Sequence, residues 1–297
     1  MTPRFLASEL PDLAPEECLF HVIPVPYEAT VSYGGGTASG PAAIIEASNQ
    51  LEVWTGEANP GMRGIYTWPA VSCKNGDAPA VMAAIAQATT TAITSGPNDA
   101  IPVLLGGEHS ITFGALKALR EQYGHFGVIH FDAHADLRDT YEGTPYSHAC
   151  VMRRATDDLG LDLFQVGIRS LSPEEVAYRN ERGIRHLDAR DFARRGGSAW
   201  LHGNAETLVP ADFPDRIFLS FDVDALDASL MPATGTPEPG GLSWWEALFL
   251  VRACLRNRTV LGLDITETAP LEHVTAPTFT AARLVYELMA EVLHTRR

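Results

Sequence analysis

The chain repeats one pattern along most of its length: a short run of apolar residues, then a longer stretch with helical character. The apolar runs cover residues 19–25, 101–105, 126–131, 163–168, 216–221 and 260–265. The helical stretches cover residues 39–51, 78–94, 110–123, 173–182, 243–256 and 277–294. Continuous apolar strands that alternate with helices are typical of a parallel sheet covered on both faces. We therefore expect one α/β domain over residues 1–297, a three-layer α/β/α sandwich with a mainly parallel central sheet.

Composition excludes several classes of protein. Hydrophobic residues make up 45% of the 297 positions, which is enough for a sizeable core. The 37 acidic residues outnumber the 22 basic ones, and a net charge of −15 opposes binding to nucleic acid and to anionic membranes. No run reaches the roughly 20 apolar residues of a membrane span, and the N-terminus lacks the apolar run of a signal peptide. We expect a cytoplasmic protein whose four scattered cysteines are reduced.

Residue types that bind metals follow three of the predicted strands. They are His109 after the strand that ends at 105, Asp132, His134 and Asp136 after the strand that ends at 131, and Asp222 and Asp224 after the strand that ends at 221. Alternate residues of an extended chain point to one side, and ligands of α/β folds bind beyond the carboxyl ends of the strands. Four buried carboxylates would repel one another unless cations compensate them. Two divalent ions would balance that charge, and an oxygen-rich set with two imidazoles suits Mn²⁺.

Three neighbours of this set receive other interpretations. His130 lies one step deeper in its strand, and we interpret it as a hydrogen-bonded core histidine. Glu108 is interpreted as an acid behind the ligands or at the start of a helix, not as a ligand. Ser110 is a residue type that caps helices, and we expect it to begin the helix that continues to Tyr123.

Five motifs resemble those of the ureohydrolase family, which contains the arginases and agmatinases. They are GGEHS (106–110), FDAHAD (131–136), SFDVDALD (220–227), PATGTPEPGG (232–241) and DITETAP (264–270), in the order of the family. The resemblance implies an α/β/α sandwich with two Mn²⁺ per chain and a water between them. It assigns one ion to His109 and Asp136, the other to His134 and Asp224, and bridging positions to Asp132 and Asp222.

The same resemblance implies roles for residues around the metals. Glu267 matches an acid that pairs with the substrate guanidinium, and Thr236 matches a residue near the substrate. His148 matches a loop histidine that contacts the substrate and delivers a proton to the departing amine. Together with the ligand Asp136, His148 and Glu267 make up the expected catalytic residues. The resemblance also implies a homo-oligomer, either a trimer or a hexamer of two trimers.

The tail of the substrate separates the branches of this family. Where the arginase branch has an Asn and an Asp for the α-amino acid group, this chain has Arg138 and Ser172. Segments 25–48, 134–143 and 147–154 are similar to the agmatinase branch. We therefore expect a small cationic guanidino substrate, agmatine first, cleaved to putrescine and urea. Guanidinobutyrate, arginine or formimidoylglutamate as substrate, a single-zinc hydrolase, and a non-catalytic binding or assembly protein are the alternatives.

Three charged residues are expected near the substrate tail, and they leave the charge of that tail open. Arg138 is expected to form an ion pair with Asp139 or Asp188, although it would also suit a substrate with an acidic tail. Glu174 and Glu175 are interpreted as acids in the first turn of a helix, where they complement the helix dipole. Contact of either one with an amine tail is the alternative.

Overall fold

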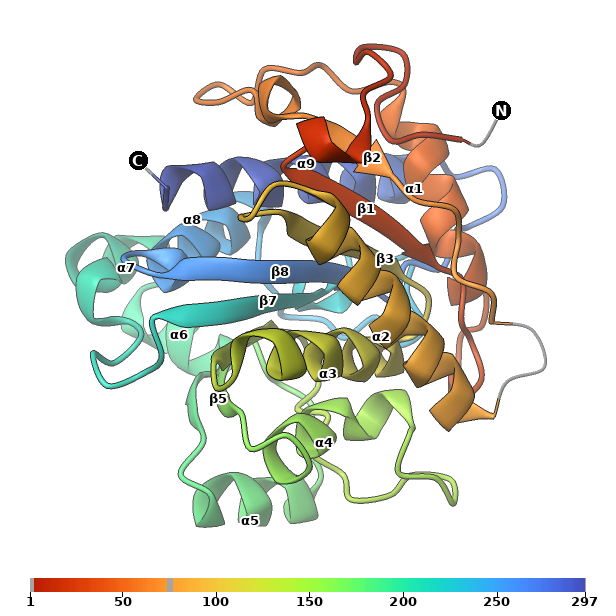
Figure 1. Cartoon of the computed structure of the whole chain (residues 1–297). Coiled ribbons are helices and arrows are strands. Elements are labelled where there is room, and N and C mark those ends of the chain that lie inside the picture. The colour runs from red at the N-terminus through yellow and green to blue at the C-terminus, as the bar shows by residue number, and fades with distance from the viewer. Residues whose placement is uncertain (1–2, 74–76, 297) are drawn as a thin grey trace.

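One sheet of eight strands, in the order β2-β1-β3-β8-β7-β4-β5-β6, forms the centre of the molecule (Figure 1). The computed structural model describes residues 3–73 and 77–296. Its strands are β1 (Phe20–Val25), β2 (Ile65–Thr67), β3 (Ile101–Gly106), β4 (Gly127–Phe131), β5 (Asp162–Val166), β6 (Arg185–Leu187), β7 (Arg216–Asp222) and β8 (Thr259–Thr266). Each pairing between neighbouring strands is parallel, which confirms the predicted sheet.

Helices cover both faces of this sheet and complete the three layers. They are α1 (Gly40–Ser48), α2 (Ala78–Ser95), α3 (Thr112–Tyr123), α4 (Val151–Asp157), α5 (Pro173–Glu181), α6 (Ala189–Arg195), α7 (Ser198–Asn204), α8 (Trp244–Leu255) and α9 (Ala276–His294). One hydrophobic cluster joins one face of the sheet to α1 and to α6 through α9, and a second joins the other face to α2 through α5. The expected α/β/α sandwich is confirmed.

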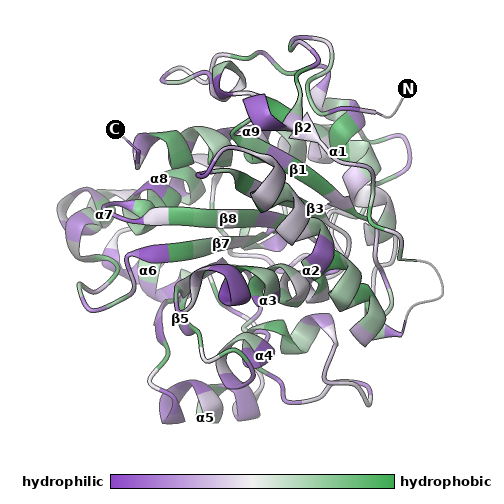
Figure 2. Ribbon diagram, viewed as in Figure 1, coloured by the Kyte–Doolittle hydropathy of each residue, from purple (hydrophilic) through white to green (hydrophobic). Residues whose placement is uncertain are grey.

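Burial explains why the central strands have continuous apolar sequences. All residues of β1, β3 and β4 are buried, since helices pack against both faces of the strands. Figure 2 shows β7 and β8 as largely hydrophobic ribbons, whereas α5 is mostly hydrophilic. No helix in residues 3–73 and 77–296 is long and apolar enough to cross a membrane.

Local capping signals begin several of the helices. Asp77 accepts a hydrogen bond from the backbone N–H of Ala80 at the start of α2. Capping boxes begin α5 at Ser172 and α8 at Ser243. The prediction that Ser110 caps a helix is wrong: a short 3-10 helix, η4 (His109–Ile111), precedes α3, and the Ser110 hydroxyl donates to the carboxylate of Glu108 instead.

The strand order brings the predicted metal-binding segments together. Strands β3, β8, β7 and β4 are neighbours at the centre of the sheet, and parallel strands end at the same edge. Phe131 pairs with Phe221, and Asp222 pairs with Thr266, so β4, β7 and β8 end at nearly the same level. The segments that follow these strands therefore meet at one point.

Candidate active site and metal centre

The side chains at this edge converge through irregular backbone and not through strand alternation. Strand β4 ends at Phe131, and Asp136 has a left-handed conformation with φ of 54°. The Asp136 carbonyl oxygen accepts the N–H groups of Met152 and Arg153 at the start of α4, which holds this conformation in place. After β7 the chain forms η7 (Val223–Ala225). The expectation that extended chain alone aligns these residues is therefore wrong, although the residues do meet.

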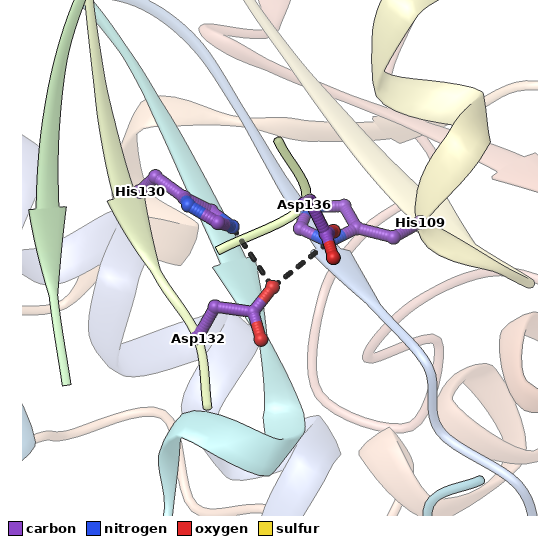
Figure 3. A group of neighbouring side chains, drawn as sticks. All are labelled: His109, His130, Asp132 and Asp136. Atoms are coloured by element: carbon purple, nitrogen blue, oxygen red, sulfur yellow. Dashed lines mark hydrogen bonds and ion pairs between the residues drawn. The ribbon is translucent and has the colours of Figure 1, made fainter. Parts of the chain in front are cut away.

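Three carboxylates surround one nitrogen of His109. Its Nδ1 atom lies 3.0 Å from Asp136 Oδ2, 3.1 Å from Asp132 Oδ2 and 3.4 Å from Asp222 Oδ2. Figure 3 shows His109, Asp132 and Asp136 pointing toward one another, with His130 beside them. All these side chains are buried. Together His109, His130, Asp132 and Asp136 form a group whose atoms could hold a metal ion.

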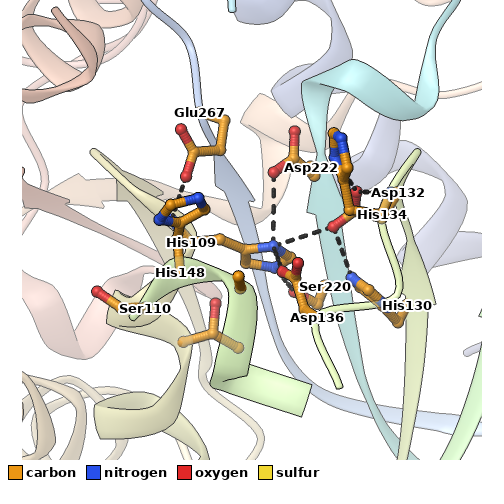
Figure 4. A network of polar contacts seen from close by, with 12 residues as sticks. His109, Ser110, His130, Asp132, His134, Asp136, His148, Ser220, Asp222 and Glu267 are labelled. Atoms are coloured by element: carbon orange, nitrogen blue, oxygen red, sulfur yellow. Dashed lines mark hydrogen bonds and ion pairs between the residues drawn. The ribbon is translucent and has the colours of Figure 1, made fainter. Parts of the chain in front are cut away.

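A second group of metal-binding atoms shares Asp132 with the first. His134 Nδ1 lies 2.9 Å from Asp224 Oδ2 and 3.5 Å from Asp132 Oδ1. The two oxygens of Asp132 thus face different histidines, as Figure 4 shows. This is the geometry of a carboxylate between two ion positions. Asp222 contacts His109 but has no such contact with His134, so a bridging role for Asp222 stays a prediction.

Hydrogen bonds behind His109 determine which of its nitrogens faces the carboxylates. Its Nε2 atom lies 2.9 Å from the hydroxyl oxygen of Ser220, and Ser220 donates its proton to Asp264 over 2.8 Å. Ser220 therefore accepts the Nε2 proton of His109, and in the neutral ring Nδ1 carries no proton. Nδ1 is buried and has no hydrogen-bond partner among the described residues. Facing three carboxylates, Nδ1 requires either a proton or a cation: despite burial, Asp132 and Asp136 hold the pKa of His109 well above its usual value. A metal ion at Nδ1 would replace that proton, so these residues fit a metal ion.

Without metal, the group takes up protons instead. Burial, followed by repulsion from Asp132, raises the pKa of Asp136 to about 7. Burial, and then the charges of Asp224 and Asp132, hold the pKa of Asp222 well above its usual value. Burial alone would lower the pKa of His134, but the charge of Asp224 and hydrogen bonds outweigh it and raise that pKa to about 12. Divalent cations would replace these protons.

His130 is the buried, hydrogen-bonded histidine that the sequence suggested. Its Nε2 lies 2.8 Å from Asp132 Oδ2. The amide of Gln165 on β5 lies 3.1 Å from the other ring nitrogen and also donates to the carbonyl of Ala135. Because Gln165 donates to Nδ1, His130 donates from Nε2 to Asp132. His130 therefore orients the carboxylate that the two groups share.

A cavity of about 20 Å³ brings the predicted site residues together. It is lined by all of the expected metal ligands and catalytic or substrate residues, namely His109, Asp132, His134, Asp136, His148, Asp222, Asp224, Thr236 and Glu267. Glu267 has a left-handed backbone with φ of 64°, and its Oε1 accepts the N–H of His109 over 2.6 Å. Burial raises the pKa of Glu267 well above its usual value, which favours a cationic partner beside it.

An outer pocket of about 340 Å³ adjoins this cavity. Both are lined by Ser32, His134, Asp136, His148 and Thr236. The remaining residues of the outer pocket are Arg138, Tyr141, Ala149, Ser170, Leu171, Ser172, Glu175 and Glu238. The volume lies at the lower end of the roughly 300–1,000 Å³ of small-molecule pockets. The outer pocket is therefore suited to the tail of a substrate whose reacting end lies in the inner cavity.

The expected ion pair of Arg138 does not form. Asp139 pairs with Arg154 at 2.6 Å, and Asp188 pairs with Arg179. The Arg138 guanidinium instead lies over the ring of Tyr141, 4.9 Å from its centre. Arg138 and Tyr141 both line the outer pocket, and a cation gains attraction from the face of an aromatic ring.

Glu175 is the first-turn acid that the sequence predicted, and Glu174 is exposed at the same helix start. Glu175 is buried, and its two oxygens accept the backbone N–H groups of Ser172 and Leu137. Its charge lies in the wall of the outer pocket, and no basic side chain of the described residues lies within 4 Å of it.

Several residues that hydrogen-bond to the predicted site residues were not identified from the sequence. Ser220, Asp264, Gln165 and Thr30 all contact predicted site residues. Ser220 and Asp264 lie inside the recognised motifs and sit at paired positions of β7 and β8. Their side chains were thus detectable as polar residues in apolar strands. Thr30 lies in a loop with no local signal.

The parallel sandwich carries two His and Asp groups at the carboxyl edge of its sheet, an arrangement that fits a protein with two neighbouring metal ions. Comparison with known proteins places it more closely. The model of the Arginase family matches residues 19–291. The chain therefore belongs to the arginase family. This family depends on a binuclear metal centre, and the relatives of this chain are hydrolases that act on guanidino C–N bonds.

Individual relatives agree with this assignment. The chain is 36% identical over 278 residues to the N(1)-aminopropylagmatine ureohydrolase of Synechocystis sp., covering 90% of this chain and 87% of that protein. It is 31% identical over 293 residues to the agmatinase of Pyrococcus horikoshii, covering 96% of each. The solved structure of proclavaminate amidino hydrolase from Streptomyces clavuligerus aligns with a TM-score of 0.87 at 28% identity, over 99% of this chain and 98% of that one.

Proposed function

We propose that this enzyme hydrolyses a guanidinium group carried on an alkylamine tail, agmatine first, to give the amine and urea. The observation that carries this proposal is the outer pocket, where Glu175 and Glu238 supply negative charge. Ser172 also lines it, and the resemblance aligns Ser172 with the Asp that serves the α-amino acid group in the arginase branch. The similarity to an agmatinase and to an aminopropylagmatine ureohydrolase supports an amine tail.

The residues that would hold two divalent cations come from the two groups, without His130 and with Asp222 added. His109 and Asp136 would bind one ion, His134 and Asp224 the other, and Asp132, with Asp222, would lie between them. We propose manganese, since an oxygen-rich set with two imidazoles suits this ion. Two such ions would balance the carboxylates and lower the pKa of a water enough for it to attack the guanidinium carbon near neutral pH.

Glu267 would bind and orient the guanidinium. One of its oxygens is fixed by the N–H of His109, and the cavity lies beside the carboxylate. A planar guanidinium can donate to both oxygens of a carboxylate, which holds the central carbon in one position. Thr236 lines both the cavity and the outer pocket, where its hydroxyl would contact the same substrate.

His148 would move the proton that the reaction requires. Water adds its oxygen to the guanidinium carbon and loses a proton, and the C–N bond to the tail breaks when its nitrogen gains one. His148 lines both the cavity and the outer pocket, where it would lie beside that nitrogen. Burial lowers its pKa, so the neutral ring predominates near pH 7 and can accept a proton before it donates one.

A substrate panel tests the function. Agmatine, N(1)-aminopropylagmatine, arginine, guanidinobutyrate and formimidoylglutamate would be compared by kcat/KM with manganese present, with urea release measured for the guanidino compounds and formamide release for formimidoylglutamate. We expect the two amine-tailed compounds to react best. Preference for guanidinobutyrate is the second candidate, because Arg138 lines the pocket without a carboxylate partner among the described residues. No turnover of any compound would contradict the proposal.

We also propose that the enzyme acts as a homo-oligomer, a trimer or a hexamer. Light scattering combined with size-exclusion chromatography would test this directly. A monomer at the concentration of the assay would refute it.

A further inference from the structure

The hydroxyl group of Thr30 lies between Glu108 and His148. Thr30 Oγ1 is 2.9 Å from Glu108 Oε1 and 3.1 Å from His148 Nδ1. The backbone N–H of His148 also donates to Thr30 Oγ1, over 3.0 Å. One hydroxyl group thus contacts both the ring and the backbone of His148.

Glu108 holds Thr30 firmly in this position. Its carboxylate is fully buried and accepts four hydrogen bonds. The backbone N–H groups of Ala29 and Thr30 donate to Oε2 at 2.5 and 2.6 Å. The hydroxyls of Thr30 and Ser110 donate to Oε1 at 2.9 and 2.5 Å. These four donors use the accepting positions of a carboxylate, so Glu108 acts only as an acceptor here.

Counting protons then settles the state of the His148 ring. A hydroxyl group has one proton to donate, and Thr30 donates it to Glu108. Both contacts with His148 must then be bonds that Thr30 accepts. In the neutral ring, Nδ1 therefore carries the proton, and Nε2 carries a lone pair. The Ser147 hydroxyl lies farther from Nδ1, at 3.5 Å, and does not change this result.

This tautomer matches what a proton carrier in the cavity needs. Nε2 of His148 has no hydrogen-bond partner within residues 3–73 and 77–296, and His148 lines the cavity. A proton accepted at Nε2 can be handed on from the same atom, while Nδ1–H keeps its bond to Thr30. If the ring turned over or changed tautomer, Nε2 would no longer present a lone pair to the reacting groups.

We propose that Thr30, held by Glu108, is a positioning residue that fixes the orientation and tautomer of His148. The inference rests on the proposed role of His148 as proton carrier. Among the described residues, the hydrogen bonds of Thr30 go to Glu108 and His148 and to none of the predicted metal ligands, so its effect on the reaction would pass through His148.

A double-mutant cycle tests this pathway. Thr30→Val should lower kcat at least about 10-fold, up to the loss of roughly 10²–10⁴ expected for His148→Ala, with KM and bound manganese nearly unchanged. Thr30→Ser keeps the hydroxyl and should recover most of kcat. In the His148→Ala background, Thr30→Val should cause no further loss, because the residue through which Thr30 acts is absent. Kinetics would use whichever compound of the substrate panel has the highest kcat/KM.

Controls separate this effect from a general loss of structure. Thr89→Val removes a buried hydroxyl on α2 that donates to the carbonyl of Ile85, and it should leave kcat unchanged. Thr30→Ala repeats the cycle if Thr30→Val does not fold.

The outcomes distinguish the inference from the function on which it rests. A normal kcat in His148→Ala would remove the proposed proton carrier and the inference with it. A reduced kcat in His148→Ala with a normal kcat in Thr30→Val would overturn the inference alone. So would a loss from Thr30→Val that persists undiminished in the His148→Ala background, since that would show a structural effect independent of His148.

Discussion

The Nε2 atom of His109 lies 2.9 Å from the hydroxyl oxygen of Ser220, and this contact leaves Nδ1 facing three carboxylates. Ser220 can accept the Nε2 proton because its own proton goes to Asp264. The hydroxyl of Thr112 and the backbone N–H of Phe221 also donate to Asp264. The tautomer of His109 is thus set by a network that begins on β8.

Ser220→Ala should therefore weaken manganese binding about 10–100-fold, the usual effect of losing a partner behind a metal-binding histidine. The measurement is a manganese titration of the chelator-treated protein, with bound metal determined by mass spectrometry. Ser48→Ala is the matched control, since it removes a buried hydroxyl that donates to Ile45 in α1. Equal affinities in Ser220→Ala and the wild type would contradict the prediction.

Asp132→Asn should have a larger effect on both metal content and activity. The two oxygens of Asp132 face His109 and His134, so the variant loses charge at both ion positions. We expect less than the full two manganese ions per chain and an activity loss beyond the roughly 10–100-fold of a supporting residue. Asp162→Asn changes an exposed carboxylate and should alter neither. Full manganese content with normal turnover in Asp132→Asn would refute the assignment of this ligand.

His148→Ala should separate chemistry from binding. Removing a general acid–base group costs roughly 10²–10⁴ in kcat. The metal-binding groups do not include His148, so manganese content and KM should stay close to those of the wild type. Steady-state kinetics together with metal analysis give the answer. An unchanged kcat would mean that another group or water carries the proton.

Stability without metal should fall as pH rises. The pKa values of Asp222 and Glu267 are raised, mainly by burial, and that of His134 is raised to about 12. A group with a raised pKa binds more protons in the folded than in the unfolded chain, so stability is lost as pH rises between the two values. Other groups oppose this trend. The pKa of Asp132 is lowered by neighbouring histidines despite its burial, and burial lowers the pKa values of His21, His130 and His148. These groups bind fewer protons in the folded chain, and the three histidines act only below their ordinary pKa of about 6.5.

The metal-free protein should therefore melt at a lower temperature at about pH 8.5 than at about pH 5.5. Because manganese replaces the protons, the rise in Tm on adding saturating manganese should be larger at the higher pH. Differential scanning calorimetry with and without chelator measures both quantities. A manganese-induced rise that is larger at the lower pH would contradict the linkage.

The central strands and most long helices could be predicted from the sequence. β1, β3, β4, β7 and β8 are buried on both faces, which produces continuous apolar runs at these positions. Edge strands β2 and β6 have three residues each and lack such a run. Helices α4, α6 and α7 have seven residues each, too few for a clear apolar period. The Asp136 carbonyl supports the start of α4 from a distant segment, so no local signal marks it.

The sequence predicted which residues could bind metal, but it did not predict how they are arranged. Residues at the ends of four neighbouring strands had to meet once the strand order was known. The left-handed conformations of Asp136 and Glu267 were not predictable, because tertiary contacts hold them there. Arg138 was misjudged because its nearby acids have other partners, Arg154 and Arg179.

Discrimination among the guanidino candidates should depend on the tail of the substrate, since Glu267 and the metal ligands are proposed to act on the guanidinium that these compounds share. Glu175 and Glu238 line the outer pocket with negative charge, and Arg138 is drawn onto Tyr141. Burying an α-carboxylate and an α-ammonium without matched partners costs several kcal/mol. We therefore expect kcat/KM for agmatine to exceed that for arginine by at least about 10²-fold, since each 1.4 kcal/mol is about tenfold.

Arg138→Ala tests the charge balance of this pocket. For an amine tail, removing a like charge should leave kcat/KM for agmatine unchanged or raise it, and should lower any turnover of guanidinobutyrate. Arg182→Ala is the matched control, since Arg182 is exposed, pairs with Asp157 and does not line the outer pocket. If the wild type prefers guanidinobutyrate and Arg138→Ala abolishes that preference with manganese content intact, Arg138 is the anchor of a carboxylate tail. In that case the negative charges of Glu175 and Glu238 do not determine the substrate preference.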